Sequence, residues 1–123
     1  MAEGKFATSV CCMDGRIQIP LTSWIKENNS VDYVDTITEP GVDKLTSDTD
    51  AVEKIKSKVN ISINAHGSKL IVVSGHHDCA GNPVTKEEHH NQIKKWVDVI
   101  NSWNLDVQVV GAWVNENWQI EKI

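Results

Sequence analysis

The stretch Leu70-Ile71-Val72-Val73-Ser74-Gly75-His76-His77-Asp78-Cys79 decides the fold of this chain. Its first half is a continuous apolar run, which is typical of a strand covered on both faces, as in a parallel sheet. The run ends at Gly75, where a change from strand to loop is expected. The sequence therefore predicts a buried strand whose carboxyl end carries an imidazole, a carboxylate and a thiol.

The rest of the chain alternates between strand and helix patterns. Further strands are expected at residues 5–11, 31–38, 105–114 and 118–123, and helices at 20–28, 47–66 and 85–103. Such alternation predicts an α/β fold in three layers. We expect a mainly parallel sheet of four strands, a C-terminal antiparallel edge strand, and helices on both faces. A length of 123 residues is enough for one domain, spanning residues 1–123.

Composition limits the partners and the compartment. The formal net charge is −5 with Lys and Arg scattered, which argues against a nucleic-acid partner. No apolar run approaches the ~20 residues that a membrane span needs, so no membrane partner is expected. Residues 1–5 are charged and unlike a signal peptide, so we expect a cytoplasmic protein. In that compartment three cysteines indicate metal binding, catalysis or burial rather than disulfides.

A second motif, Cys12-Met13-Asp14-Gly15-Arg16, also follows a predicted strand. Because the carboxyl ends of parallel strands meet at one edge of a sheet, we expect Cys12 to lie close to His76 and Cys79. Two thiolates and one imidazole are the ligand set of an open zinc site. A metal with three protein ligands and a free position generates a nucleophile from water. The sequence therefore predicts a Zn²⁺ site on Cys12, His76 and Cys79.

Asp14 allows two interpretations of this site. It could be a fourth ligand that closes the metal. Alternatively, it could accept a hydrogen bond from water at the metal while Arg16 holds it in place. The two arrangements could also be two states of one site, since release of Asp14 by Arg16 would let the carboxylate reach the metal.

Other polar residues near the motifs have weaker predictions. Cys11 is expected to be a buried thiol that faces away from Cys12, because side chains alternate along a strand. A phosphatase-type loop is excluded, since it needs five residues between Cys and Arg, whereas only four separate Cys11 from Arg16 and three separate Cys12 from Arg16. Gln18 is a surface residue or a substrate donor. His77, His89 and His90 have two interpretations: they are proton shuttles, or they are ordinary surface and helix-start residues. Core or subunit contacts are expected for Trp24, Trp96, Trp103, Trp113 and Trp118.

The motifs C-x-D-x-R and H-x-x-C, in this order and separation, resemble those of the β-class carbonic anhydrases. The segment Gly111-Ala112-Trp113-Val114 and the hairpin after it also resemble the end of that fold. The similarity in the order of elements runs from about residue 5 to residue 123. It implies a zinc lyase that interconverts carbon dioxide and bicarbonate through zinc-bound hydroxide. It further implies zinc on Cys12, His76 and Cys79, an Asp14–Arg16 dyad, and a homodimer or higher homo-oligomer.

The chain also departs from that family. No N-terminal helical arm of the kind that clasps the neighbouring subunit is expected within residues 1–123, the insert after H-x-x-C is small, and Glu39-Pro40-Gly41 stands where an Asn-Gly-like loop is common. Two alternatives to carbon dioxide hydration therefore stay open. One is hydrolysis of carbon disulfide or carbonyl sulfide at the same site. The other is a non-catalytic zinc-binding or regulatory protein in which Asp14 closes the metal.

Overall fold

The computed structural model describes residues 2–123 and contains a five-stranded sheet with the order β2-β1-β3-β4-β5. The strands are β1 (Phe6–Cys11), β2 (Tyr33–Thr38), β3 (Leu70–His76), β4 (Gln108–Val114) and β5 (Ile120–Lys122). All neighbouring pairs are parallel except β4 and β5, which form an antiparallel hairpin. The predicted sheet, with its antiparallel edge strand, is therefore confirmed.

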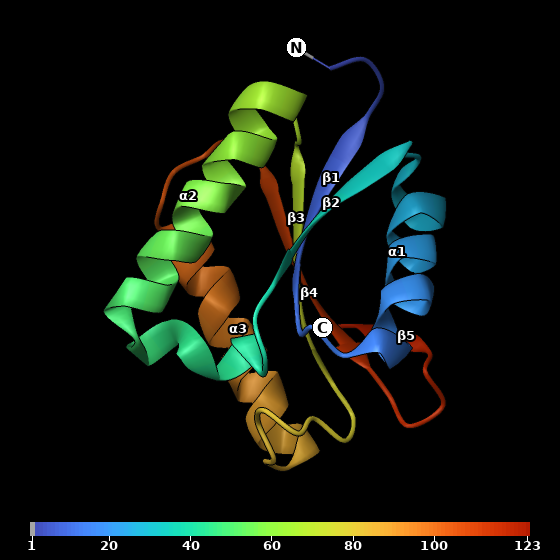
Figure 1. The fold of residues 1–123 in the computed structure, drawn as a ribbon, viewed down its shortest axis with the longest axis vertical. Helices are drawn as coiled ribbons and strands as arrows, with labels where there is room; N and C mark the ends of the chain where they lie inside the picture. Colours follow the sequence, from blue (N-terminus) through green and yellow to red (C-terminus); the bar gives the residue numbers. More distant parts are fainter. Residues whose placement is uncertain (1) are drawn as a thin grey trace.

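Helices cover both faces of this sheet, as predicted (Figure 1). They are α1 (Gly15–Asn29), α2 (Thr49–His66) and α3 (Lys86–Asn101), with a short 3₁₀ helix η1 (Val42–Ser47) between β2 and α2. α1 packs on one face, whereas α2 and α3 pack on the other. In the described residues no helix combines the length and the apolar character that crossing a membrane requires.

Two apolar clusters, one on each face, hold the layers together. The cluster under α1 contains Ile17, Leu21 and Val72, and the cluster under α2 and α3 contains Ile71 and Trp96. All residues of β3 are buried, which agrees with a strand covered on both sides. Full burial of each such apolar side chain stabilises the fold by about 1.5–3 kcal/mol, so β3 is the centre of the core.

Helix boundaries follow the capping residues. α2 begins after Asp48, whose side chain accepts a hydrogen bond from the Ala51 backbone amide, close to the predicted start. α1 instead begins at Gly15, because Asp14 caps it by accepting from the Arg16 amide, and Pro20 lies inside the helix. The expectation that Pro20 is the first helical residue was wrong. The earlier start places Asp14 and Arg16 of the C-x-D-x-R motif at the N-terminus of α1.

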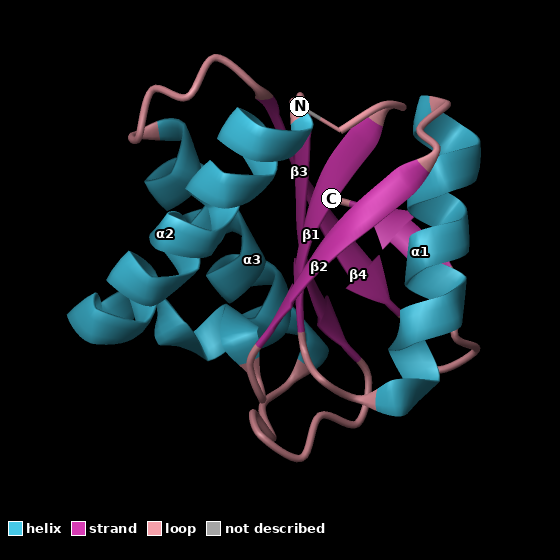
Figure 2. Ribbon diagram, turned by 45° about the horizontal axis from the view of Figure 1, so that its top comes forward, coloured by secondary structure: helices cyan, strands magenta, loops and turns pink. Residues whose placement is uncertain are grey.

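The loops after β1, β2 and β3 gather at one end of the sheet (Figure 2). Two of them meet backbone to backbone at Gly41 and Gly81. A Cβ on Gly41, whose φ is +57°, would lie 2.7 Å from the Gly81 carbonyl carbon. Both positions therefore have no room for a side chain, and the close approach joins η1 to the loop after β3.

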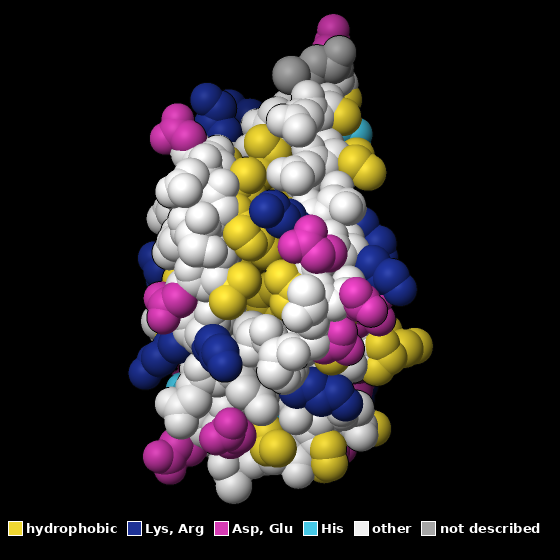
Figure 3. All heavy atoms as spheres, turned by 90° about the vertical axis from the view of Figure 1, so that its left-hand side faces the viewer, with side chains coloured by type: hydrophobic (Ala, Val, Ile, Leu, Met, Phe, Trp, Pro, Cys, Tyr) yellow, Lys and Arg dark blue, Asp and Glu magenta, His cyan; other side chains and the backbone are white. Residues whose placement is uncertain are grey.

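The outer face of α2 and α3 carries charges of both signs around a band of apolar side chains (Figure 3). The Nζ of Lys56, within α2, lies 5.5 Å from the centre of the Trp103 ring, which follows α3. Trp96 and Trp113 lie fully in the core, as expected for tryptophan in a chain of this size.

Candidate metal centre

Three potential metal ligands converge at the carboxyl ends of β1 and β3. Cys12 follows β1, His76 is the last residue of β3, and Cys79 lies three positions further on. One donor atom from each lies within 4.8 Å of the other two, and the two sulfurs are 3.9 Å apart. All three residues are buried. The structure thus brings together the three residues that the two motifs offered as ligands.

The imidazole of His76 is turned so that one nitrogen is left for a metal. Its Nδ1 lies 2.7 Å from the His77 carbonyl oxygen and must donate, since a carbonyl only accepts. Its Nε2 is buried without a hydrogen-bond partner. An unpaired buried nitrogen costs free energy, and a second hydrogen bond that fixes the ring is what metal-bound histidines show. The orientation therefore fits a ligand.

Backbone N–H groups point at the two sulfurs. The Gly41 amide donates to Cys12 Sγ at 3.4 Å, and the nearby backbone amides of Gly81 and Asn82 act to lower the pKa of the Cys79 thiol. Burial, with Cys12 close by, nevertheless raises the pKa of the Cys79 thiol to about 11. A divalent cation would offset the cost of burying a thiolate. The cysteines would therefore lose their protons when the metal binds. The set of two sulfurs and one imidazole nitrogen fits Zn²⁺.

Asp14 lies beside this cluster, held by Arg16. The Arg16 Nη2 is 2.7 Å from Asp14 Oδ2 and the Nε is 3.1 Å from Oδ1, a two-point contact. These hydrogen bonds lower the pKa of Asp14 to about 2. The Oδ2 atom is 4.0 Å from His76 Nε2, so the ionised carboxylate borders the ligands while its oxygens are engaged by the guanidinium. This is the arrangement expected of an open site.

Arg16 contacts two further residues, Asp78 and Trp118, that the sequence did not relate to it. Its Nη1 lies 3.1 Å from Asp78 Oδ2, and its Nη2 donates to the Asp78 carbonyl at 3.0 Å. The guanidinium also lies 4.7 Å from the centre of the Trp118 ring, on the β4–β5 hairpin. Asp78 was visible inside the second motif, but nothing in the sequence relates Trp118 to Arg16. The dyad is therefore anchored to two separate parts of the chain.

Gln18 and Cys11 line the base of the site without joining the ligands. Gln18 Nε2 donates to the carbonyls of Cys12 and Asp14, each at 2.9 Å, so this amide braces the first motif. Cys11 is a buried thiol outside the ligand group, as predicted. The alternation argument was wrong, because β1 ends at Cys11 and both cysteines belong to the cluster under α1.

The remaining histidines lie apart from the ligands. His77 is exposed, and its ring is 6.4 Å from that of Trp118. His89 is 2% exposed, and both His89 and His90 contact Trp113, which belongs to the cluster under α2 and α3. The ligand thiols belong to the opposite cluster. Burial lowers the pKa of His90. The geometry favours structural roles for His89 and His90 over proton shuttling.

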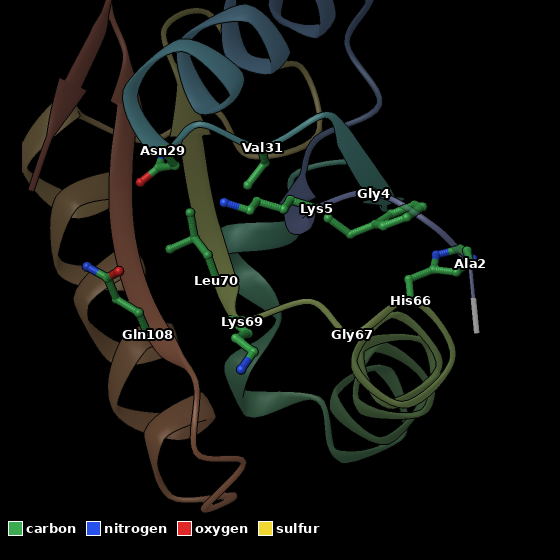
Figure 4. A pocket seen from close by; sticks show the side chains of 11 residues that line it. Ala2, Gly4, Lys5, Asn29, Val31, His66, Gly67, Lys69, Leu70 and Gln108 are labelled. Atoms are coloured by element: carbon green, nitrogen blue, oxygen red, sulfur yellow. The ribbon is translucent and has the colours of Figure 1, made fainter.

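A cavity of about 660 Å³ lies at the other end of the molecule (Figure 4). Its lining includes Phe6, Leu70 and Gln108, which are the first residues of β1, β3 and β4. Since these strands are parallel, the cavity is at the opposite edge of the sheet from the metal ligands. It is not the space in which chemistry at the metal centre would occur.

Comparisons with known proteins show the fold and the family of this chain. A solved structure, "Carbonic anhydrase from Glaciozyma antarctica", has a TM-score of 0.63 at 15% identity, with 94% of this chain and 80% of that chain covered. At this identity the likeness shows a shared fold. None of the curated protein sequences matches the chain. A family model described as "Putative carbonic anhydrase" matches residues 2–123. With nearly every residue matched, the chain belongs to this carbonic anhydrase family.

Proposed function

We propose that this protein is a zinc-dependent carbonic anhydrase that reversibly hydrates carbon dioxide to bicarbonate. The observation that carries the proposal is the juxtaposition of a Cys12–His76–Cys79 donor set with an ionised, immobilised carboxylate. Family membership and the shared fold support it. A zinc ion held by these three residues would supply a Lewis acid that lowers the pKa of water at its open position.

The chain's own residues would orient the reacting water. Asp14 Oδ1 accepts from both the backbone amide and the Nε of Arg16, whereas Oδ2 accepts only from Nη2 and keeps a second lone pair. Asp14 would accept a hydrogen bond from the water and so direct a lone pair of that water toward the substrate carbon. The low pKa of Asp14 keeps it an acceptor over the whole working range of pH.

The Asp14–Arg16 contact also favours an open site over the non-catalytic alternative. For Asp14 to close the metal, its carboxylate would have to leave the Arg16 guanidinium, which Asp78 and Trp118 hold in place. We therefore infer that the fourth position is available to water. We also infer a homodimer or higher homo-oligomer that works in the cytoplasm, where three free cysteines remain reduced.

Stopped-flow hydration of carbon dioxide by zinc-loaded protein tests this function. We expect turnover that rises with pH above neutrality, because two thiolates neutralise the zinc charge and leave its water less acidic than in a three-histidine site. Asp14→Asn should lower kcat by about 10²-fold or more, since it removes an acceptor at the reacting water. Carbonyl sulfide and carbon disulfide are assayed in parallel as the alternative substrates.

The matched control is Asp48→Asn, because Asp48 caps α2 as Asp14 caps α1. It should leave kcat unchanged. A fully zinc-loaded protein with no turnover of carbon dioxide at any pH would contradict the proposal. Turnover of carbonyl sulfide or carbon disulfide alone would keep the mechanism and change the substrate.

A further inference from the structure

A buried polar network lies behind the metal centre, on the α3 side of the sheet. The Asp43 carboxylate is 1% exposed, and its Oδ2 accepts a hydrogen bond from His89 Nδ1 at 2.5 Å. Its Oδ1 accepts from the Asn82 amide at 2.9 Å, and the same amide nitrogen lies 2.7 Å from Gln92 Oε1. No part of the proposed reaction uses these residues.

This network reaches the segments that carry the metal ligands. Asn82 follows Cys79 by three positions, and its backbone amide donates to the Cys79 carbonyl oxygen at 3.3 Å. Asp43 also lies against Gly75, the residue before His76. A Cβ on Gly75 would collide with Asp43 Oδ2, so the absence of a side chain there makes room for the carboxylate. Asp43 thus contacts Gly75, which is bonded to His76, and Asn82, which lies in the same loop as Cys79.

η1, which carries Asp43, is itself fixed at several points. The Trp96 indole donates to the Val42 carbonyl at 2.9 Å, and Lys44 Nζ lies 2.5 Å from the Gly81 carbonyl oxygen. Just before η1, the Gly41 amide donates to Cys12 Sγ. This one short segment therefore contacts the surroundings of all three ligands.

Stability alone is a poor explanation of the network. Removing a carboxylate and an imidazole from water costs several kcal/mol, and apolar residues of similar volume often stabilise a core at least as well. Buried polar groups that are fully hydrogen-bonded do fix one arrangement of the chain. Here both oxygens of Asp43 have donors, and the arrangement that they fix is that of the ligand-bearing segments.

We propose that Asp43 and His89 are positioning residues of the metal centre. Through Asn82 they hold the loop of residues 77–82 so that the Cys79 sulfur faces Cys12 and His76. Against Gly75 they set the end of β3 that carries His76. The proposal rests on the metal binding in the proposed function, but not on hydration of carbon dioxide.

The test measures Zn²⁺ affinity of the full chain by competition with a chromophoric chelator, and the visible spectrum of the Co²⁺-loaded protein. Asp43→Asn and His89→Leu should each weaken Zn²⁺ binding about tenfold to a hundredfold and shift the thiolate-to-cobalt bands. His89→Asn should restore most of the affinity, because its Nδ2 donor replaces the histidine Nδ1–H. Asn82→Ala should also weaken binding, and it supplies an independent variant if Asp43→Asn does not fold.

The matched controls come from the other histidine–aspartate pair, His66 with Asp35, whose Nδ1 and Oδ2 are 2.7 Å apart. Asp35→Asn and His66→Leu should leave Zn²⁺ affinity and the Co²⁺ spectrum unchanged. Folded Asp43 and Asn82 variants with wild-type affinity would overturn the positioning role, as would equal losses in the controls. A wild-type chain that binds no zinc would overturn this role and the proposed function together, whereas unaffected variants of a zinc-binding chain overturn only this role.

Discussion

At the scale of the residue, Arg16 determines the pKa of Asp14 beside the metal centre. Its hydrogen bonds lower the pKa of Asp14 to about 2 from an ordinary value of 3.8. We expect Arg16→Met to return that pKa toward 3.8, and Arg16→Lys to give an intermediate value because lysine lacks the two-point contact. The carboxyl carbon resonance of Asp14, followed through an acid titration, measures the change. An unaltered midpoint in Arg16→Met would show that another group holds the pKa down.

The same shift has a consequence for stability. Because the folded pKa lies below the unfolded value, the Asp14–Arg16 contact stabilises the fold above about pH 4 and loses its effect as the pH falls toward 2. The difference in unfolding free energy between wild type and Arg16→Met should therefore shrink in that window.

Cys11 should make the fold sensitive to alkali. Burial raises the pKa of its thiol from 9.0 to about 11. The unfolded chain loses this proton first, so the folded state is favoured fully below pH 9 and progressively less between pH 9 and 11. In the metal-free protein, urea unfolding at several pH values should show a smaller alkaline loss of stability for Cys11→Ala than for wild type. Equal slopes would mean that the thiol is not responsible.

At the scale of the element, the end of β3 depends on a glycine. Gly75→Ala would press a methyl group against Asp43, and relief of such overpacking costs about 1–3 kcal/mol. Gly15→Ala is the matched control, since a Cβ there meets no atom within 4 Å and Gly15 is the first residue of α1. Its effect should stay below about 1 kcal/mol. Urea unfolding of both metal-free variants measures these values, and equal effects would argue against a tight fit at Gly75.

Elements with a strong local signal could be predicted from the sequence. The apolar run of β3 and the helical patterns at 47–66 and 85–103 led to positions close to those of β3, α2 and α3, and Asp48 and Thr85 cap the two helices in the structure. η1 has no periodic pattern, because tertiary contacts such as the one between Trp96 and Val42 hold it. α1 was placed too late because proline usually marks a first turn, whereas here the Asp14 cap determines the start.

The metal centre was predictable only in its innermost part. Its ligands lie in two compact motifs at strand ends, and strand direction in a parallel sheet brings such ends together. Asp43 and Trp118 reach the site from η1 and the last hairpin, and their roles arise from approach in space. No spacing or periodicity in the sequence indicates that Asp43 and Trp118 come close to the ligands, so their roles could not be predicted.

At the scale of the whole molecule, a metal should stabilise the folded chain. The ligands exist as a set only when β1 and β3 are paired, so zinc binds the folded state in preference to the unfolded one. Binding at a free concentration of a hundred times Kd adds about 2.7 kcal/mol. Calorimetry with zinc and with a chelator should therefore show a higher Tm with zinc. Cys79→Ser should lose that difference, and a persistent difference would place the metal elsewhere.

The distance along the chain between the two thiols affects the order of folding and metal binding. Cys12 and Cys79 are 67 positions apart, and the closure of so long a loop is an entropic barrier that the chain must cross before both sulfurs meet. A contact formed after the transition state slows unfolding far more than it speeds folding. Zinc would thus bind late and mainly slow unfolding. A nascent chain on the ribosome has no complete ligand set for zinc until Cys79 has emerged.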